Sequence, residues 1–228
     1  MKRQILFTIT VFVLLITGTA SAQQKPGQML TGKKPQQIPG RVECEYFDVG
    51  GEGLAYHDAD SINNGSGKLN PANGNFLHEF RMKEGVDISF TKTGGIDNNP
   101  YNKVTPDSNQ LYVGWTMPGE WINYTVQVNK TAVYRVGVMY TANGDGSISL
   151  DLDGHPVATN LKILSTNDKQ DSVAWRQWHH WNKIDTLGSI KITKGIHKLT
   201  LHVVDHGQMN FDCLEFSIRE STSLQSKK

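Results

Sequence analysis

The sequence predicts an all-β fold, a jelly-roll sandwich of two antiparallel sheets in a single domain. Short runs rich in β-branched and aromatic residues recur along the chain, separated by Gly, Asn, Asp and Pro. Leu199, Leu201 and Val203 alternate with polar residues, which indicates a strand with one buried face. Turn sequences such as Asn143-Gly144 separate successive runs, so the second half of the chain is predicted to form antiparallel hairpins.

The strand-like runs are distributed unevenly along the chain. They occupy residues 41–47, 86–90, 120–128, 133–140, 147–152, 189–193, 197–204 and 210–218. The segment from 50 to 107 differs, because it is rich in Gly and Asn and contains only one convincing strand. Long loops on a rigid sandwich usually carry function. We therefore expect this segment to contribute binding residues.

Both ends of the chain are predicted to lie outside the sandwich. Lys2 and Arg3 precede an apolar run at 5–16 and small residues at 20–22, which is the order of a cleavable secretory signal. The run is too short to favour a transmembrane helix of roughly 20 residues. We predict a signal peptide at 1–22, a linker at 23–39, the sandwich at 40–218 and a flexible tail at 219–228. The expected location is secreted or periplasmic.

Charge and cysteine content exclude little beyond nucleic-acid binding. The net charge is +1, from 23 basic and 22 acidic side chains, so nothing indicates a nucleic-acid surface. Cys44 and Cys213 are the two cysteines, and an exported protein meets conditions that permit oxidation. The pair either forms a disulfide or consists of two small buried core residues.

Acidic residues occur in the first and the last predicted strands. Glu43 and Glu45 share one face of the first strand, because side chains alternate along a strand. Asp212 supplies a third carboxylate if the two strands lie close together. A hard cation with oxygen ligands holds such groups together, while a solvated face or salt bridges are the alternatives. Asp58 and Asp60 have the same alternation and are candidates for a second cation site.

Tryptophans on predicted loops are the candidates for ligand binding. Trp115 follows a short strand, and Trp175, Trp178 and Trp181 form a cluster. Flat aromatic rings pack against the C–H face of a sugar ring, and a nearby amide or carboxylate binds its hydroxyl groups. Ordinary core packing is the alternative for each ring.

Several of these segments, taken in order, resemble the family 6 carbohydrate-binding modules. They are Glu43-Cys44-Glu45 in its strand, Val113-Gly114-Trp115, the stretches 119–126 and 195–199, and Asn210-Phe211-Asp212. The stretches 51–58 and 84–88 are similar to modules carried by agarases, which points to a galactan or marine-type polysaccharide. The resemblance spans residues 39–216 and implies a calcium-containing β-sandwich that binds a polysaccharide or oligosaccharide. It also implies polysaccharide-degrading enzymes as partners.

The resemblance assigns the metal ligands and one loop residue. It implies that Glu43, Glu45 and Asp212 bind a structural calcium ion. Tyr56 lies in the long loop, where it either contacts the ligand or braces the loop.

The same resemblance assigns the stacking residues. It makes Trp115 the first stacking ring, Trp178 the second, Trp181 a core residue and Asn210 the amide that bonds the sugar. The family usually has Gly-Gly before the second ring, whereas residues 176–177 here are Arg-Gln. A shifted alignment therefore leaves Trp175 as the alternative second ring.

Two other functions fit a β-sandwich. A jelly-roll glycoside hydrolase or lyase needs two carboxylates about 5 to 10 Å apart, and the Glu-x-Asp-x-x-Glu spacing of sandwich glucanases does not occur in this sequence. A sandwich used for protein contacts would bury Trp115 and Trp178 in the core, whereas a binding module would bring them together at a loop site. We predict a non-catalytic binding module.

Overall fold

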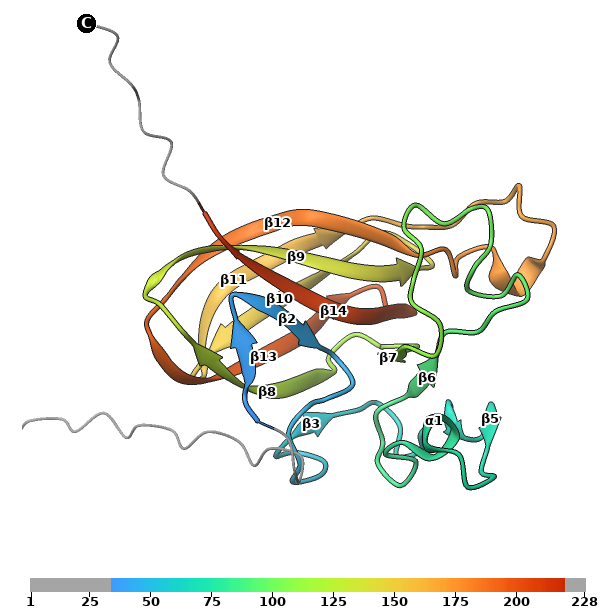
Figure 1. Cartoon of the computed structure of the whole chain (residues 1–228), viewed down its shortest axis with the longest axis horizontal. Helices are drawn as coiled ribbons and strands as arrows, with labels where there is room; N and C mark the ends of the chain where they lie inside the picture. Colours follow the sequence, from blue (N-terminus) through green and yellow to red (C-terminus); the bar gives the residue numbers. More distant parts are fainter. Residues whose placement is uncertain (1–33, 220–228) are drawn as a thin grey trace, which may run out of the picture.

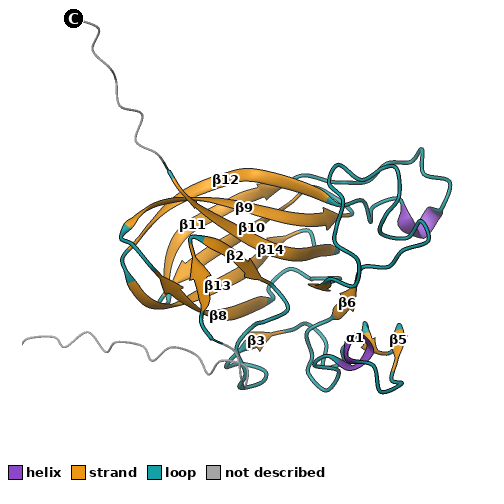
Figure 2. Cartoon of the chain, in the orientation of Figure 1, coloured by secondary structure: helices purple, strands orange, loops and turns teal. Residues whose placement is uncertain are grey.

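A computed structural model describes residues 34–219, in which two six-stranded sheets pack face to face (Figures 1 and 2). The described part is almost entirely strand and loop, so the predicted β-sandwich is confirmed. The predicted signal peptide, most of the predicted linker, and residues 220–228 lie outside the described residues.

The first sheet has the order β1-β8-β13-β10-β11, and β3 also pairs with β8. Neighbouring strands are antiparallel, except that β1 runs parallel to β8. Its strands are β1 (Gln36–Ile38), β3 (Tyr56–His57), β8 (Trp121–Val128), β10 (Gly146–Leu152), β11 (His155–Ile163) and β13 (Gly195–Asp205).

The second sheet has the order β12-β9-β14-β7-β6, and β2 also pairs with β14. The first and last segments of the domain therefore lie side by side, as expected, with Val42 opposite Leu214. Its strands are β2 (Gly40–Glu43), β6 (Ile88–Phe90), β7 (Leu111–Val113), β9 (Ala132–Ala142), β12 (Asn182–Ile192) and β14 (Met209–Ile218).

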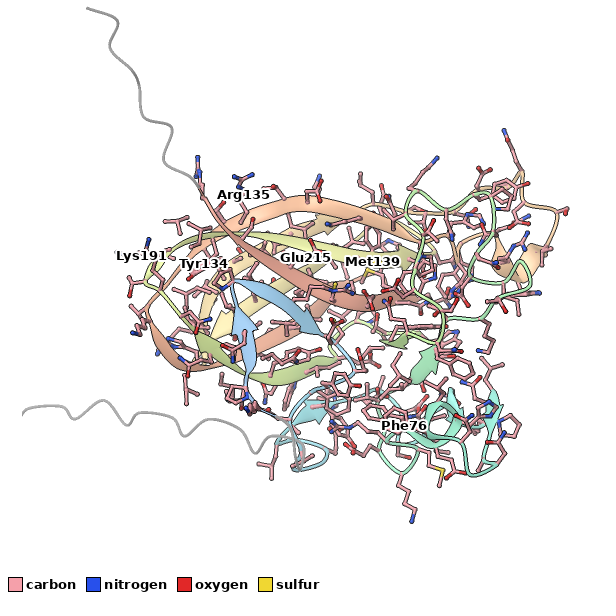
Figure 3. All side chains as sticks on the ribbon, viewed as in Figure 1. Phe76, Tyr134, Arg135, Met139, Lys191 and Glu215 are labelled. Atoms are coloured by element: carbon pink, nitrogen blue, oxygen red, sulfur yellow. The ribbon has the colours of Figure 1, made fainter. Side chains whose placement is uncertain are left out.

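The core lies between the two sheets because each strand turns alternate side chains inward. Leu199, Leu201 and Val203 are buried on β13, which confirms the predicted face. Tyr134 on β9 is also fully buried. Arg135, its neighbour in sequence, is exposed and projects from the outer face of the second sheet (Figure 3).

The long segment between β3 and β6 forms a small lobe beside the sandwich. It contains β4 (Ser66–Gly67), β5 (Asn70–Pro71) and the one-turn helix α1 (Phe76–Glu79), and a short 3-10 helix, η1 (Ala174–Arg176), lies in a later loop. Asn75 caps α1 by accepting a hydrogen bond from the Leu77 backbone N–H. Phe76 is exposed on this lobe (Figure 3). No helix among residues 34–219 is long and apolar enough to span a membrane.

The structure differs from the predicted boundaries in three places. The predicted linker ends too late, because β1 lies inside it and buries Ile38 completely. The strand β11 was absent from the prediction, and β12 begins at Asn182 rather than at residue 189. Cys44 and Cys213 are both buried free thiols. Of the two alternatives, the structure therefore shows two buried core residues and no disulfide between them.

The burial of β1 leads to a stability prediction. Ile38→Ala should lower the free energy of unfolding by about 2–4 kcal/mol, because it empties a fully buried position between the sheets. The exposed neighbour Gln37 provides the matched control, and Gln37→Ala should change stability by less than about 0.5 kcal/mol. Chemical denaturation of both variants measures the difference. Equal stabilities would mean that β1 is an external linker.

Candidate functional site

Two long loops meet at one end of the sandwich. One follows β6 and the other connects β11 to β12, and they lie together at the right of Figure 1. Hydrogen bonds join them: the Tyr101 hydroxyl donates to the Gln170 carbonyl at 2.9 Å, and the Arg176 guanidinium donates to the Gly95 carbonyl. The Trp181 backbone N–H also donates to the Asn102 side chain at 2.9 Å. The loops are therefore held as one unit before any ligand arrives.

These loops enclose a cleft of about 550 Å³ whose walls are mostly apolar. The lining residues are Leu69, Lys92, Ile96, Asp97, Tyr112, Trp115, Trp175, Trp178 and His179. Three separate parts of the chain contribute tryptophan or aliphatic side chains, including the long segment expected to carry function. A cleft of this size with few polar groups is typical of small-molecule sites.

The predicted stacking residues Trp115 and Trp178 both line this cleft. Trp175 lines it as well and is 60% exposed, so the structure brings both candidates for the second ring to one place. Trp181, in contrast, is fully buried and packs edge-on against Tyr112 at a centroid distance of 5.2 Å. Its predicted place in the core is confirmed.

Trp115 has an unusual backbone conformation that the neighbouring residues stabilise. Its φ is +48°, in the left-handed region that residues other than glycine seldom adopt. Its backbone N–H donates to Asn210 Oδ1 at 2.9 Å. Gly114 permits this approach, because a Cβ there would lie 3.1 Å from the same oxygen.

The structure gives Asn210 a different role from the predicted contact with a sugar. Its side chain is completely buried and is not among the residues lining the cleft. Besides the bond from Trp115, its Nδ2 is 2.8 Å from Thr141 Oγ1 and 2.9 Å from His179 Nδ1. All of its polar atoms are therefore engaged within the protein. Asn210 therefore holds Trp115 and His179, two residues that line the cleft, in place through hydrogen bonds.

Tyr56 is also removed from the cleft. It is 4% exposed, its ring packs edge-on against Phe47, and its hydroxyl accepts a hydrogen bond from the Gly85 backbone N–H at 2.9 Å. Tyr56 therefore does not line the aromatic cleft, and these contacts are those of a residue that braces the loop. Asp58 and Asp60 lie in the same loop and accept hydrogen bonds from backbone N–H groups two residues further on.

Asp97 forms the polar base of the cleft, and the sequence analysis missed it. Its Oδ1 accepts hydrogen bonds from His179 Nε2 at 2.6 Å and from Trp181 Nε1 at 2.9 Å, and its Oδ2 accepts one from the Lys92 backbone N–H at 2.7 Å. Burial alone would raise the pKa of Asp97, but the bonds from His179 and Trp181 hold it below its usual value. No local motif marks this residue, because its side-chain partners, His179 and Trp181, lie far away in sequence.

Asp171 organises the loop that carries Trp175 and Trp178. Its buried carboxylate accepts hydrogen bonds from the Arg176 guanidinium at 2.6 and 2.8 Å and from His180 Nε2 at 3.0 Å. The bonds from Arg176 hold the pKa of Asp171 well below its usual range. His180 therefore faces Asp171 whereas the adjacent His179 faces Asp97.

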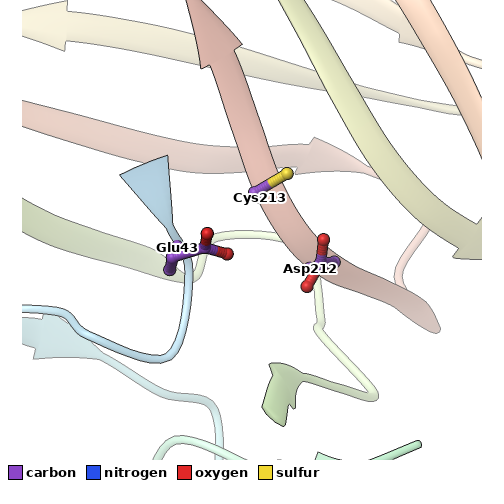
Figure 4. Close-up of side chains that lie close together, drawn as sticks. All are labelled: Glu43, Asp212 and Cys213. Atoms are coloured by element: carbon purple, nitrogen blue, oxygen red, sulfur yellow. The ribbon is translucent and has the colours of Figure 1, made fainter. Parts of the chain in front are cut away.

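Two of the three predicted metal ligands, Glu43 and Asp212, lie close together at a second place, beside β2 and β14. Glu43 and Asp212 face each other across these strands (Figure 4), and with Cys213 they form the only His, Cys, Asp or Glu trio among residues 34–219 whose ligand atoms lie within 4.8 Å of one another. Glu45 lines the same pocket as Glu43, which has a volume of about 280 Å³.

The electrostatics of this acidic cluster favour an added cation. Arg41 contacts Asp212 at 2.5 Å and Glu43 at 3.2 Å, so one guanidinium pairs with two carboxyl groups. Burial raises the pKa of Glu45 well above its usual value and that of Asp212 to about 7, although Arg41 opposes the latter shift. Oε2 of Glu45 is buried without a hydrogen-bond partner. A calcium ion, which takes hard carboxylate oxygens as ligands, would stabilise the ionised forms that burial disfavours.

Comparison with known proteins identifies the family. A family model described as carbohydrate binding module (family 6) matches residues 88–218. No curated protein matches the chain.

Solved structures resemble the chain at low sequence identity. A glycoside hydrolase family 43 arabinoxylan arabinofuranohydrolase from Bacillus subtilis is 18% identical, with a TM-score of 0.48, over 83% of this chain and 29% of that enzyme. A β-1,3-glucan binding family 6 module from Bacillus halodurans is 14% identical, with a TM-score of 0.44, over 80% of this chain and 98% of its own. A family 6 module from Clostridium stercorarium, in complex with cellobiose, is 11% identical, with a TM-score of 0.47, over 82% of this chain and 98% of its own.

The buried Asp171 network leads to a pH-dependent prediction. Asp171→Asn should lower the melting temperature at pH 7 by about 5–10 °C, because it removes the charge that Arg176 and His180 face. A carboxyl group whose pKa is lowered by folding stabilises the protein above its unfolded-state pKa, and this contribution is lost as the pH falls below about 4. The difference in melting temperature between the variant and the wild type should therefore narrow progressively as the pH falls from about 4 to about 2. A difference that stays constant from pH 7 to pH 2 in thermal denaturation would contradict the assignment.

Proposed function

Since the chain belongs to the family 6 carbohydrate-binding modules, we propose that its aromatic cleft binds a polysaccharide or oligosaccharide without cleaving it. The single observation that carries this proposal is the convergence of Trp115 and Trp178 on one cleft. A sandwich that used these residues only for stability would bury them between the sheets. Here they line an open site on loops.

The chemistry of the cleft suits a sugar ring. A pyranose has faces of C–H groups that pack well on flat aromatic rings, and hydroxyl groups around its edge. Trp115 and Trp178 supply two such rings, and the exposed ring of Trp175 supplies a third. With three tryptophans in one cleft, we propose a ligand of more than one sugar unit.

Hydrolysis is the alternative function, and the cleft offers little support for it. Glycosidases place two carboxyl groups about 5 to 10 Å apart on either side of the scissile bond. Asp97 is the one carboxylate among the residues lining the cleft, and its oxygens already accept three hydrogen bonds. Of the acidic cluster, Glu43 and Glu45 line a different pocket, and Asp212 lies close to Glu43.

For that acidic cluster we propose a structural calcium ion. Glu43, Glu45 and Asp212 would hold it, and the unpartnered Oε2 of Glu45 supports this assignment. A divalent cation would offset the charge that Arg41 leaves uncompensated. Because Glu43 belongs to β2 and Asp212 to β14, the ion would fasten the first strand of the second sheet to the last.

The setting of this activity is also a proposal. A signal sequence at 1–22 would export the protein to the periplasm or the medium, where polysaccharide-degrading enzymes act and would be its partners. The segments at 51–58 and 84–88 favour galactans among the candidate ligands, and the resemblance to agarase-borne modules supports their inclusion in a test.

Binding should depend on the predicted second ring. Trp178→Ala should weaken binding at least about 30-fold, because an aromatic anchor in a central pocket commonly contributes 2 kcal/mol or more. Affinity electrophoresis against xylan, β-glucans, agar and mannans measures this, with reducing ends assayed in the same samples.

The control and the contrary outcomes separate the alternatives. Phe76→Ala removes an exposed aromatic ring on the separate lobe and should leave binding unchanged. Unaltered binding by Trp178→Ala would refute the site. New reducing ends would favour hydrolysis, and binding to no polymer would favour a protein-contact role.

Removal of calcium should destabilise the protein. A chelator should lower the melting temperature of the wild type by several degrees, because an ion present at 100 times its dissociation constant contributes about 2.7 kcal/mol. Asp212→Ala should lower it without chelator and abolish the sensitivity. Asp185→Asn, an exposed carboxylate elsewhere, should retain the sensitivity of the wild type. A wild type indifferent to chelator and added calcium would remove the metal proposal.

A further inference from the structure

A continuous chain of hydrogen bonds runs behind the aromatic cleft. Asp97 Oδ1 is 2.6 Å from His179 Nε2, His179 Nδ1 is 2.9 Å from Asn210 Nδ2, and Asn210 Oδ1 is 2.9 Å from the Trp115 backbone nitrogen. Asp97, His179 and Asn210 are all buried. The chain thus connects the carboxylate at the base of the cleft to the backbone of Trp115, whose ring lines the same cleft.

The direction of each bond follows from its end at Trp115. A backbone N–H only donates, so the atom of Asn210 that faces it must be the carbonyl oxygen. The amide nitrogen of Asn210 then faces His179 Nδ1 and donates to it. His179 Nδ1 therefore carries no proton, and the single ring proton is on Nε2, where it is donated to Asp97.

The adjacent His180 differs from His179 because both of its ring nitrogens face hydrogen-bond acceptors. His180 Nδ1 is 3.0 Å from the Thr166 carbonyl oxygen, and its Nε2 is 3.0 Å from Asp171 Oδ2. Both partners accept hydrogen bonds, so His180 can carry a proton on each nitrogen without losing either bond. Of the two neighbouring histidines, only His179 has a donor facing one of its nitrogens.

We propose that His179 is a pH-sensitive positioning residue, whose neutral Nε2–H form holds Trp115 in its binding conformation and whose protonation releases it. This inference rests on the proposed function, because it concerns the regulation of the same cleft. It makes ligand binding strong at neutral and alkaline pH and weak in acid.

The release follows from hydrogen-bond geometry. A proton on Nδ1 of His179 would face the amide N–H of Asn210, and two donors cannot share a hydrogen bond. If the Asn210 amide turned over to accept from His179, its nitrogen would face the Trp115 N–H instead. Either way a bond is lost. Trp115, whose φ of +48° is held by that contact, would then lose its support.

The groups around His179 act on the balance between its neutral and its protonated form. Asp97 is the carboxylate that faces His179, and Lys92 interacts electrostatically with Asp97. Burial keeps the Tyr112 phenol, whose ring centroid is 5.8 Å away, protonated and uncharged. Trp178 and Trp181, whose rings contact His179 edge-on, carry no charge. Asn210 is thus the group that selects the neutral form.

Nuclear magnetic resonance of the full chain tests the inference without a ligand. Imidazole ¹⁵N shifts at pH 8 should show a neutral Nε2–H tautomer for His179. On titration to pH 5, the Trp115 backbone amide should shift with the same midpoint as the His179 ring. A His179 that is doubly protonated or Nδ1–H at pH 8, or a Trp115 amide that does not follow it, would overturn the proposal.

Affinity measurements against the polymer found in the electrophoresis panel give the second readout. If only the neutral form binds, wild-type affinity should fall about tenfold for each pH unit below the midpoint of His179. His179→Gln, whose amide can accept from Asn210 and donate to Asp97 but cannot be protonated, should bind with a flat pH profile. His155→Gln alters an exposed histidine at the far end of the β10–β11 hairpin and should retain the wild-type profile.

The two readouts separate this inference from the proposed function. Binding that is equally pH-dependent in His179→Gln and the wild type would overturn the inference while leaving carbohydrate binding intact. Binding to no polymer would instead refute the proposed function, and the Trp115 amide titration would still decide the role of His179.

Discussion

The pairing of β14 with its neighbours is the constraint on which the rest of the structure depends. This last strand lies against β9, β2 and β7, so it joins the two ends of the domain and the edge that carries the cleft. Its register with β9 is interrupted between Phe211 and Cys213. The interruption leaves Asp212 as an extra residue, as in a β-bulge, and bulges re-aim side chains next to functional sites.

The bulge allows β14 to contribute side chains both to the core and to the acidic cluster. Phe211 and Leu214 both belong to the main core although three positions separate them, and a regular strand would place them on opposite faces. The extra residue shifts the alternation of side chains by one position, so both Phe211 and Leu214 point into the core. Asn210 can then support Trp115 while Asp212, two positions later, faces Glu43, so both sites depend on the same local irregularity.

The sequence predicts the parts of this protein that local patterns encode. The alternation of Leu199, Leu201 and Val203, the burial of Trp181 and the convergence of Trp115 with Trp178 are confirmed. Short strands that complete a sheet were less visible. β1 was missed because it comprises three residues and pairs parallel with β8, and β11 because, at the sheet edge, much of it is exposed and polar.

Roles that depend on distant partners could not be predicted from the sequence. Asn210 was expected to meet the ligand, but its orientation is fixed by Trp115, 95 positions away. Tyr56 was a ligand candidate because it lies in a long loop, yet its hydroxyl is engaged by Gly85 inside that loop. Asp97 has no motif, since its importance comes from His179 and Trp181. A residue type indicates what a side chain can do, and only the fold shows which partner it meets.

These internal bonds have a consequence for how the cleft selects its ligand. The carboxylate of Asp97 and both nitrogens of His179 already have protein partners, so the polar groups at the cleft base hold the walls in place. Immobile walls lower the entropy lost on binding, because fewer side chains must be ordered. For the proposed sugar ligand, the remaining contacts would be mainly aromatic faces, whose attraction depends on ring spacing and orientation. Under the proposed function, selectivity would therefore arise chiefly from the shape of the cleft, and any change in the Trp115 backbone would change that shape directly.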